Sequence, residues 1–428
     1  MEWLRIRTLL VFCLFLLSAI AFLDRTNISI AGAQISNEYR LGNIHLGWVF
    51  SAFLIGYAVF QIPAGWLAVR LGPRRILAAG VLWWGIFTAM TTIVPAGAHG
   101  AMWLLIAVRF ALGAGEAVVY PASNQFVARW IPALERGRAN GWIFAGVGAG
   151  AGLTPPILAA IIAHLGWRAS FWLSAAIGVA AGAVWYLIAR DSPEQHPNIS
   201  ASELNEIRNG LTRATENNLL QPRLPWRAIT SSTVLMLTTS YFCFGYVAWV
   251  FFSWFYLYMA QARGLDIKAS ALYTMLPFLA MTVCCLVGGV ANDWLTRRYG
   301  PRIGRCGLGI LSLFIAARFL VVGSTIESAN LAGMILAGGA GALYLSQSSY
   351  WSVSADIAGP HAGVVSGMMN MGAQAGGAVT ASLTPWIATR FGWTSAFITA
   401  ACLAVLGALA WLFVDPAQKL HDTVSLSS

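Results

Sequence analysis

Long apolar runs follow one another along almost the whole chain, and they are the feature that most restricts how it can fold. A run of about 20 apolar residues is long enough to cross a lipid bilayer as a single helix. Such a run has to be helical, because no water is present there to satisfy the backbone polar groups. Charged residues make up only 10% of the chain, whereas a soluble domain carries about 25%. We therefore expect an all-α integral membrane protein.

The apolar runs fall into two sets of six, separated by a polar stretch at residues 190–227. This stretch alternates charges with helix-forming residues, which predicts a solvated linker with a short amphipathic helix. The expected organisation is an N-terminal six-helix bundle at residues 1–190, a cytoplasmic linker at 191–228 and a C-terminal six-helix bundle at 229–428. The twelve predicted membrane-spanning helices lie approximately at residues 8–33, 44–68, 75–95, 101–122, 139–163, 168–189, 231–258, 270–295, 303–324, 329–353, 363–388 and 393–414.

The net charge of +10 follows a topological pattern. With the N-terminus inside, 18 of the 26 Lys and Arg residues fall in loops on that side of the membrane and 5 on the other. The remaining three, Arg25, Arg109 and Arg318, fall within predicted helices. Because loops rich in Lys and Arg stay in the cytoplasm, both termini are predicted to be cytoplasmic. The chain has no basic stripe with exposed aromatics, so nucleic acid is not an expected partner.

Neither the cysteines nor the histidines form a catalytic or metal-binding motif. The six cysteines lie in or beside apolar runs without CxxC spacing, and the six histidines are scattered over loops and tail. We interpret the cysteines as small packing residues. The Gly-rich runs at 141–152 and 371–382 lie within predicted helices, so they indicate close helix packing or a hinge and not a nucleotide-binding loop. No metal site, no catalytic residue and no enzyme activity are predicted.

The two halves of the chain resemble each other. LTPPILAAIIAHLGWRASF (153–171) is similar to LTPWIATRFGWTSAF (383–397), and GWLAVRLGPRR (65–75) is similar to GVANDWLTRRYGPR (289–302). Each pair joins equivalent helices in the same orientation. This pattern predicts two bundles related by a pseudo-two-fold axis, with a binding site between them. Two pairs of glycines also recur at an offset of 226 residues: Gly137 with Gly363, and Gly141 with Gly367.

Four charged residues lie within predicted helices of the N-terminal half: Asp24, Arg25, Arg109 and Glu116. A charged group at mid-membrane costs about 2.5–3.5 kcal/mol on insertion scales, so such groups are expected to face the protein interior. Arg109 and Glu116 are two helical turns apart, too far to pair directly. Asp24 and Arg25 point about 100° apart, so one can face the fourth helix while the other faces a central cavity. A static structural network and a working site both remain open.

The repeat, the loop motif GWLAVRLGPRR and the octapeptide FLDRTNIS resemble the major facilitator superfamily. Within it, DRTNIS together with RFALGAGE resembles the anion:cation symporter family, which includes bacterial sugar-acid, tartrate and phthalate permeases and the vesicular glutamate and sialic acid carriers. The resemblance covers essentially the whole chain. It implies a monomeric transporter of the bacterial inner membrane that works by alternating access. Its partners would be the lipid bilayer, protons and a small organic anion, namely a sugar acid, a dicarboxylate or an aromatic acid.

The implied activity is uptake of the anion by symport, driven by the proton gradient and needing no cofactor. An antiporter of organic anion and phosphate remains an alternative, as does a membrane sensor that does not transport. The identity of the anion and the choice between proton and sodium as the coupling ion stay open.

The resemblance also implies roles for single residues. Arg25 would bind the substrate carboxylate, Asp24 and Glu116 would carry protons, and Arg109 would be the switchable partner of an acid. A carboxyl group in a dry site can be tuned to bind and release protons near neutral pH, and the planar arginine fork suits a carboxylate.

Three further residues are candidates for substrate binding. Tyr57 and Asn370 fall where the family carries substrate-contacting residues, and Tyr246 is a candidate for the cavity wall. A packing role remains open for each. The run SQSSYWSVSAD (346–356) is interpreted as ordinary helix packing by small residues.

The loop motif implies a gate on the cytoplasmic side. Its usual acid is replaced by Val69 in the first repeat, whereas the second repeat keeps the acid. This departure puts in doubt how strongly the protein favours an outward-open state. The fifth helix also carries Gly146, Val147 and Gly148 where some relatives have a polar side chain, which favours a substrate smaller or less hydroxylated than a sugar acid. The predicted gating residues are Gly65, Arg70, Gly72, Arg74 and Asp293.

Overall fold

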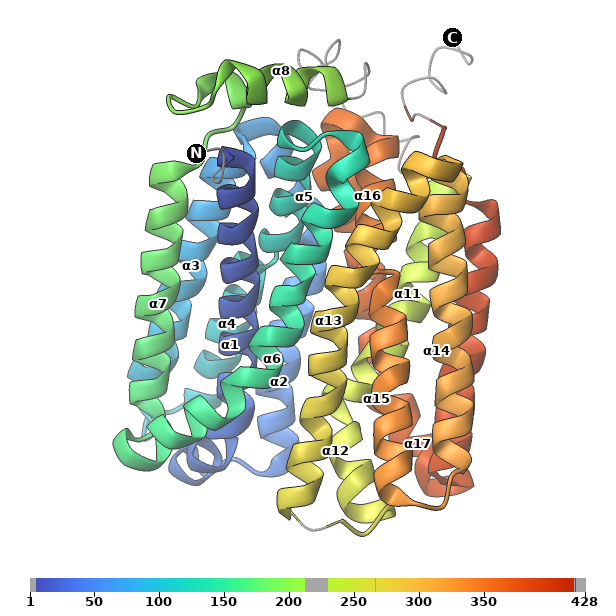
Figure 1. The fold of residues 1–428 in the computed structure, drawn as a ribbon. Coiled ribbons are helices and arrows are strands. Elements are labelled where there is room, and N and C mark those ends of the chain that lie inside the picture. Colours follow the sequence, from blue (N-terminus) through green and yellow to red (C-terminus); the bar gives the residue numbers. More distant parts are fainter. Residues whose placement is uncertain (1–4, 212–229, 266, 419, 421–428) are drawn as a thin grey trace.

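The computed structural model describes residues 5–211, 230–265, 267–418 and 420. Ten stretches of this described chain are long and apolar enough to cross a membrane. The last of them, Ala329–Phe413, contains three crossings, because it is interrupted near residue 360 and again at Gly392. The other nine cross once each, so the described residues make twelve crossings. The predicted all-α membrane fold is confirmed, and the described part has no β-strand (Figure 1).

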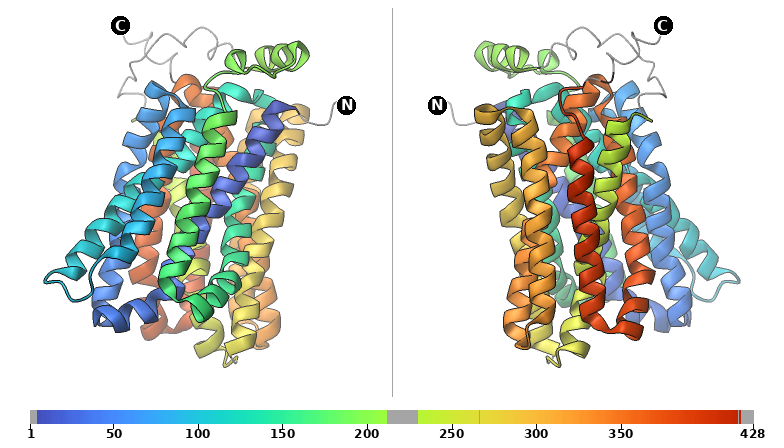
Figure 2. Two further views of the ribbon diagram at one scale, coloured as in Figure 1. Left: turned by 90° about the vertical axis from the view of Figure 1, so that its left-hand side faces the viewer. Right: turned by 90° about the vertical axis from the view of Figure 1, so that its right-hand side faces the viewer.

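The N-terminal half packs as one bundle, on the left in Figure 1. Its elements are α1 (Ile6–Tyr39), α2 (Asn43–Leu71), α3 (Pro73–Ile93), α4 (Ala101–Glu116), α5 (Val119–Trp130), η1 (Ala133–Glu135), α6 (Arg136–Leu165) and α7 (Trp167–Ile188). The predicted linker helix is present as α8 (Ala201–Gly210), after η2 (Pro193–Gln195). It lies across the end of the molecule where α1 begins and α17 ends, which we call the α8 end (Figures 1 and 2).

The C-terminal half forms the second bundle, beside the first. Its elements are α11 (Ser232–Ser253), α12 (Phe255–Leu257), η3 (Tyr258–Ala262), α13 (Ile267–Tyr299), η4 (Arg302–Gly307), α14 (Leu308–Thr325), α15 (Ala329–Leu345), α16 (Gln347–Ala358), η5 (Gly359–His361), α17 (Ala362–Ala410) and η6 (Trp411–Phe413). The predicted linker falls between α7 and α11. Its second part, with the predicted boundary at residue 228, lies outside the described residues, so the three-part division stays a prediction.

The internal repeat is visible in how helices end. Gly166 lies between α6 and α7 with φ +80°, and Gly392 interrupts α17 with φ +84°. Residues with a side chain rarely adopt a positive φ, so glycine is the natural choice at both turns. The two glycines are 226 residues apart, as the sequence pattern predicts.

The outer surface of both bundles carries large apolar side chains. Trp103 is 63% exposed, Leu187 68% and Phe391 64%, and many other Leu, Ile, Val and Trp side chains point outward in the same way. Soluble proteins rarely expose apolar surface on this scale. Together with the twelve crossings, this surface identifies a multi-pass membrane protein.

Candidate functional site

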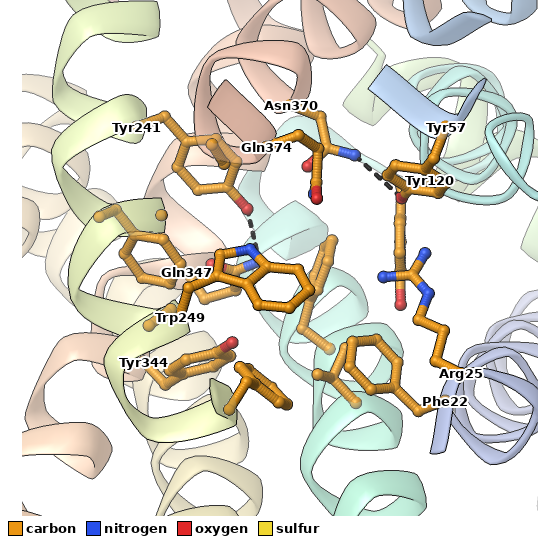
Figure 3. Close-up of a pocket in the computed structure, with 17 residues that line it drawn as sticks. Phe22, Arg25, Tyr57, Tyr120, Tyr241, Trp249, Tyr344, Gln347, Asn370 and Gln374 are labelled. Carbon is orange, nitrogen blue, oxygen red and sulfur yellow. Dashed lines mark hydrogen bonds between the residues drawn. The ribbon is translucent and has the colours of Figure 1, made fainter. Parts of the chain in front are cut away.

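A small cavity of about 60 Å³ lies between the two bundles (Figure 3). Helices of the first bundle line one side, and helices of the second bundle line the other. Arg25 is the sole charged side chain among the described residues that line it. A volume of about 60 Å³ can hold a few waters or part of a small ligand. The only formal charge among the described lining residues is positive. The polar lining includes Arg25, Tyr57, Tyr241, Gln347, Asn370 and Gln374.

Arg25 extends from α1 to the cavity and is tightly held. Its Nε donates to Oε1 of Glu116 on α4, at 2.5 Å. Its guanidinium lies 4.4 Å from the ring centroid of Tyr57 and 4.7 Å from that of Phe22, so the flat cation packs against aromatic faces. Its buried Nη2 has no hydrogen-bond partner among the described residues. Arg25 thus has one nitrogen engaged and another left for a ligand.

Asp24 points away from the cavity, as expected for the residue next to Arg25 on a helix. Its carboxylate is directed toward Trp84 of α3 and Ser174 of α7, and it lies within electrostatic range of Glu116 and Arg109. It is only 4% exposed. Neither of its oxygens has a hydrogen bond of normal geometry to any described residue. Asp24 is therefore a buried acid placed behind the cavity wall.

Arg109 is also buried and makes no ion pair with the described residues within 4.0 Å. Its guanidinium packs 4.9 Å from the ring centroid of Phe53. The seven-residue spacing correctly predicts that it does not pair with Glu116. The four predicted charges thus form one buried cluster on α1 and α4, and only Arg25 reaches the cavity. Their proposed roles in substrate and proton binding remain predictions.

Besides Arg25, two of the three further candidates for substrate binding, Tyr57 and Asn370, line the cavity. Asn370 of α17 donates from Nδ2 to the hydroxyl of Tyr57 at 3.2 Å and to Oε1 of Gln61 at 3.0 Å, which links α17 to α2 across the two bundles. Tyr246 is the exception. Its hydroxyl bonds to Thr384 at 3.0 Å, between α11 and α17, and it is not among the described residues that line the cavity. The structure therefore does not place Tyr246 at this cavity, and its part in substrate binding stays a prediction.

Tyr241, five residues earlier on α11, takes that place. Its hydroxyl accepts hydrogen bonds from Nε2 of Gln347 at 2.8 Å and from Nε1 of Trp351 at 2.9 Å. Sequence reasoning missed Tyr241 because the seventh apolar run is aromatic on every face. It also missed Gln374, although this residue follows Asn370 by one helical turn and shares its face, a signal that the i, i+4 spacing carries.

The two bundles also meet at the α8 end, where the start of α6 touches α13. Both oxygens of Asp293 on α13 accept from backbone N–H groups, one from Gly137 and one from Arg138, each at 2.8 Å. The first N–H groups of a helix have no partner within it and carry a partial positive charge, so a carboxylate binds well there. Arg136 of α6 adds an ion pair across the bundles, 2.7 Å from Asp356 of α16. These contacts close the α8 end.

Because Val69 replaces the loop-motif acid in the first repeat, another side chain binds the helix start there. At the start of α17, the backbone N–H of Gly363 donates to Oε1 of Gln125 at 2.8 Å. Nε2 of Gln125 donates in turn to the carbonyl of Pro360 at 2.9 Å. A neutral amide of α5 therefore binds the helix start that corresponds to the one held by Asp293. Gly65 packs so closely on Gly363 that a Cβ on Gly65 would overlap the Gly363 carbonyl.

The remaining predicted gating residues keep their contacts within the first bundle. Gly72 joins α2 to α3 with φ +92°. The backbone N–H of Arg74 donates to Asp191 at 2.9 Å, and its guanidinium packs on Tyr186. The guanidinium of Arg70 lies over Trp66, 5.1 Å from the ring centroid. Gly65 and Asp293 thus lie where the two bundles meet, whereas a gating role for the other three stays a prediction.

We expect Asp293→Asn to loosen the contact between the bundles at the α8 end. An asparagine can accept from only one of the two N–H groups and loses the charge, which costs about 1.5–3 kcal/mol for a hydrogen bond to a charged group. This corresponds to about a ten- to hundredfold shift toward the open form. Spin labels at the exposed positions 75 and 298, in a cysteine-free background, would report longer distances.

Asp191→Asn is the matched control for this prediction. Asp191 binds the start of α3 within the first bundle, so its replacement should leave the distance between the labels unchanged. An unchanged distance in Asp293→Asn would show that this carboxylate does not keep the α8 end closed.

Comparisons with known proteins agree with this geometry. The family model of the Major Facilitator Superfamily matches residues 14–381 and 352–425. A probable sulfoacetate transporter of Cupriavidus necator is 34% identical over 399 residues, covering 93% of this chain and 91% of that protein. A probable L-galactonate transporter of Escherichia coli is 28% identical, with 98% and 91% covered.

The fold is also similar to solved structures. A proton:xylose symporter of the major facilitator superfamily superposes with a TM-score of 0.73 at 15% identity, covering 98% of this chain and all of that one. At this identity the likeness concerns the fold alone. Because the family model spans nearly the whole sequence, the chain belongs to the Major Facilitator Superfamily, a family of membrane transporters and not of enzymes.

Proposed function

We propose that this protein takes up a small organic carboxylate anion by proton-coupled symport. The observation that carries the proposal is the position of Arg25. It is the sole charged residue among the described cavity-lining side chains, and Glu116 holds its Nε from behind at 2.5 Å. A cation at the meeting point of two repeat bundles is suited to binding an anion that both bundles can enclose.

The pair of Arg25 and Glu116 suggests how proton and anion binding are coupled. While Glu116 is ionised, it competes with the substrate carboxylate for the same guanidinium. A proton on Glu116 removes its charge and leaves Arg25 free to bind the anion strongly. Release of the proton on the other side of the membrane restores the competition and expels the anion. Each partner thus favours binding of the other, as linkage requires.

Asp24 and Arg109 complete this scheme in the proposal. Both are buried beside the pair and without a close partner among the described residues. While Glu116 is ionised, its like charge favours a proton on Asp24, the proposed second proton site. Once Glu116 is protonated, Arg109 can compensate the charge of ionised Asp24. Alternating access then needs the closed α8 end to open while the bundles close on the opposite side.

The anion is proposed to be short. The named relatives include probable transporters of sulfoacetate and L-galactonate, and the cavity of about 60 Å³ favours the smaller of the two. A phosphate dianion carries both charges on one compact group and would favour arginines from both bundles, whereas a single arginine can bind one carboxylate of a longer anion. The antiporter alternative therefore has less support.

The proposed location is the bacterial inner membrane. Arg-rich helix ends lie at the α8 end, with Arg74 at the start of α3, Arg138 at the start of α6 and Arg297 near the end of α13. Arg-rich ends of this kind stay in the cytoplasm, which would place α8 and both termini there. We propose a monomer that uses the proton gradient and no cofactor.

Uptake of radiolabelled sulfoacetate and L-galactonate into proteoliposomes tests the proposal. We expect accumulation with an inward proton gradient, its loss on adding a protonophore, and no response to a sodium gradient alone. Accumulation that ignores the proton gradient would reject symport with protons. Counterflow against phosphate loaded inside the vesicles would instead favour the antiporter.

A further inference from the structure

The hydroxyl of Tyr241 is constrained in an unusual way. A tyrosine hydroxyl has one O–H donor and two acceptor lone pairs. At Tyr241 both acceptor positions are taken, because Gln347 and Trp351 each donate an N–H to it, at 2.8 and 2.9 Å. An indole N–H can only donate, so the direction of the Trp351 contact is fixed. The hydroxyl is left with its own proton and no further lone pair to offer.

With Gln347 and Trp351 both donating, that proton has no acceptor among the described residues. No other hydrogen bond of the Tyr241 hydroxyl is present, although the residue is only 3% exposed. A buried donor without a partner is costly, so this O–H calls for an acceptor in the cavity, such as a water or an oxygen of a bound ligand. Tyr241 lines the cavity from the second bundle, whereas Arg25 lines it from the first (Figure 3).

We propose that Tyr241 is a dedicated donor for the far end of the transported anion. On this basis, which rests on the proposed function, the substrate class is a short carboxylate with a second oxygen acceptor. Arg25 binds the carboxylate, and Tyr241 binds an oxygen of a sulfonate, of a second carboxylate or of a hydroxyl group. The described lining of the second bundle has no cation, so this second contact selects by hydrogen bonding and not by net charge.

The proposal also gives the second bundle a part in closure. An anion that reaches both Arg25 and Tyr241 links the two bundles, whereas an acid with an apolar end makes a polar contact with Arg25 alone. An acid without this second acceptor leaves the Tyr241 hydroxyl unpaired when it binds. The free-energy penalty of the unpaired hydroxyl disfavours that acid relative to the proposed substrate.

Binding of two ligands of similar shape to the purified full-length protein tests this inference. Sulfoacetate and tert-butylacetate share the carboxylate end, but three methyl groups replace the sulfonate oxygens in the second. We expect wild-type protein to bind sulfoacetate more tightly by calorimetry. Tyr241→Phe should weaken sulfoacetate binding about ten- to a hundredfold, as for a lost hydrogen bond to a charged group, and leave tert-butylacetate binding unchanged.

Tyr350→Phe is the matched control. The Tyr350 ring lies 4.7 Å from that of Tyr241, and its hydroxyl bonds to Ser240 within the second bundle and not to the cavity. This variant should bind both ligands as the wild type does. The melting temperature without ligand checks that each variant is folded.

The outcomes separate this inference from the proposed function. Equal sulfoacetate binding by wild type and Tyr241→Phe would overturn the role of Tyr241 and leave anion transport standing. Equal binding of the two ligands to wild-type protein would overturn it as well, without any variant. If sulfoacetate, malonate, L-galactonate and tert-butylacetate all fail to bind wild-type protein, the proposed function itself fails, and the inference fails with it.

Discussion

Arg25→Gln is expected to lose anion uptake and binding almost completely. The variant removes the only charge among the described side chains of the cavity. A charge-assisted hydrogen bond to a carboxylate is worth about 1.5–3 kcal/mol, so even one such bond gives a loss of about ten- to a hundredfold. A bidentate contact would raise this loss further. Uptake and calorimetric binding of sulfoacetate measure it.

A second variant separates binding from stability. Arg25→Gln alone leaves Glu116 buried without its partner, and breaking a buried pair in this way costs about 3–5 kcal/mol. The double variant Arg25→Gln with Glu116→Gln removes both charges. It should recover the melting temperature but not anion binding. Recovery of binding in the double variant would show that Arg25 acts only as the structural partner of Glu116.

Arg318→Gln is the matched control for charge. Arg318 is an arginine within α14, exposed on the outer face of the second bundle and away from the cavity. Its replacement should leave sulfoacetate binding within the error of the measurement. A loss as large as that of Arg25→Gln would mean that the total positive charge, and not its position, governs anion binding.

The second large effect is expected from Glu116→Gln, which should separate exchange from accumulation. Glutamine cannot carry a proton, but it keeps the shape of the side chain and leaves Arg25 free to bind the anion. Exchange of labelled for unlabelled anion should therefore continue, whereas accumulation driven by a proton gradient should fall to the level reached without a gradient. The rise of wild-type uptake with falling external pH should disappear as well.

Glu38→Gln provides the comparison. Glu38 lies beyond the membrane span of α1 and pairs with Arg168 at 2.5 Å. Hydrogen bonds from the Arg168 guanidinium lower the pKa of this carboxyl group. Glu38 is therefore ionised and paired at every pH above the pKa that it has in the unfolded chain. The pairing is lost only as the pH falls through the lower pKa of the folded state. Its replacement should leave the pH profile of uptake near neutrality intact. Proton-driven accumulation by Glu116→Gln at the wild-type level would exclude Glu116 as the proton carrier.

Much of the fold could be predicted because the bilayer leaves few choices for an apolar chain. A run such as residues 139–163 has to be helical in lipid, and α6 indeed covers it. The predicted ends are less accurate. The sequence predicts the first helix at 8–33, but α1 continues to Tyr39, because beyond the lipid its end is stabilised by contacts such as that of Glu38 with Arg168. Apolarity alone does not show where such a polar extension stops.

The sequence could predict which residues lie at the site but not which of them contact each other. Charges in an apolar run indicate an interior position, and Arg25, Tyr57 and Asn370 do line the cavity. The contact of Arg25 with Glu116 joins residues 91 apart in sequence, and only the relative position of α1 and α4 brings them together. Tyr241 could not be recognised for another reason: a helix that is apolar on every side gives no periodic signal of its inward face.

Two contacts that join the bundles at the α8 end differ in chemistry. A neutral amide, that of Gln125, binds the start of α17, whereas a carboxylate, that of Asp293, binds the start of α6. An amide neither gains nor loses a proton in ordinary solution, whereas the carboxylate of Asp293 loses its charge when it is protonated. Acid on that side is therefore expected to weaken the contact between α6 and α13 and to leave the contact between α5 and the start of α17 unchanged. The two bundles would then separate by a rotation about the side that Gln125 holds together.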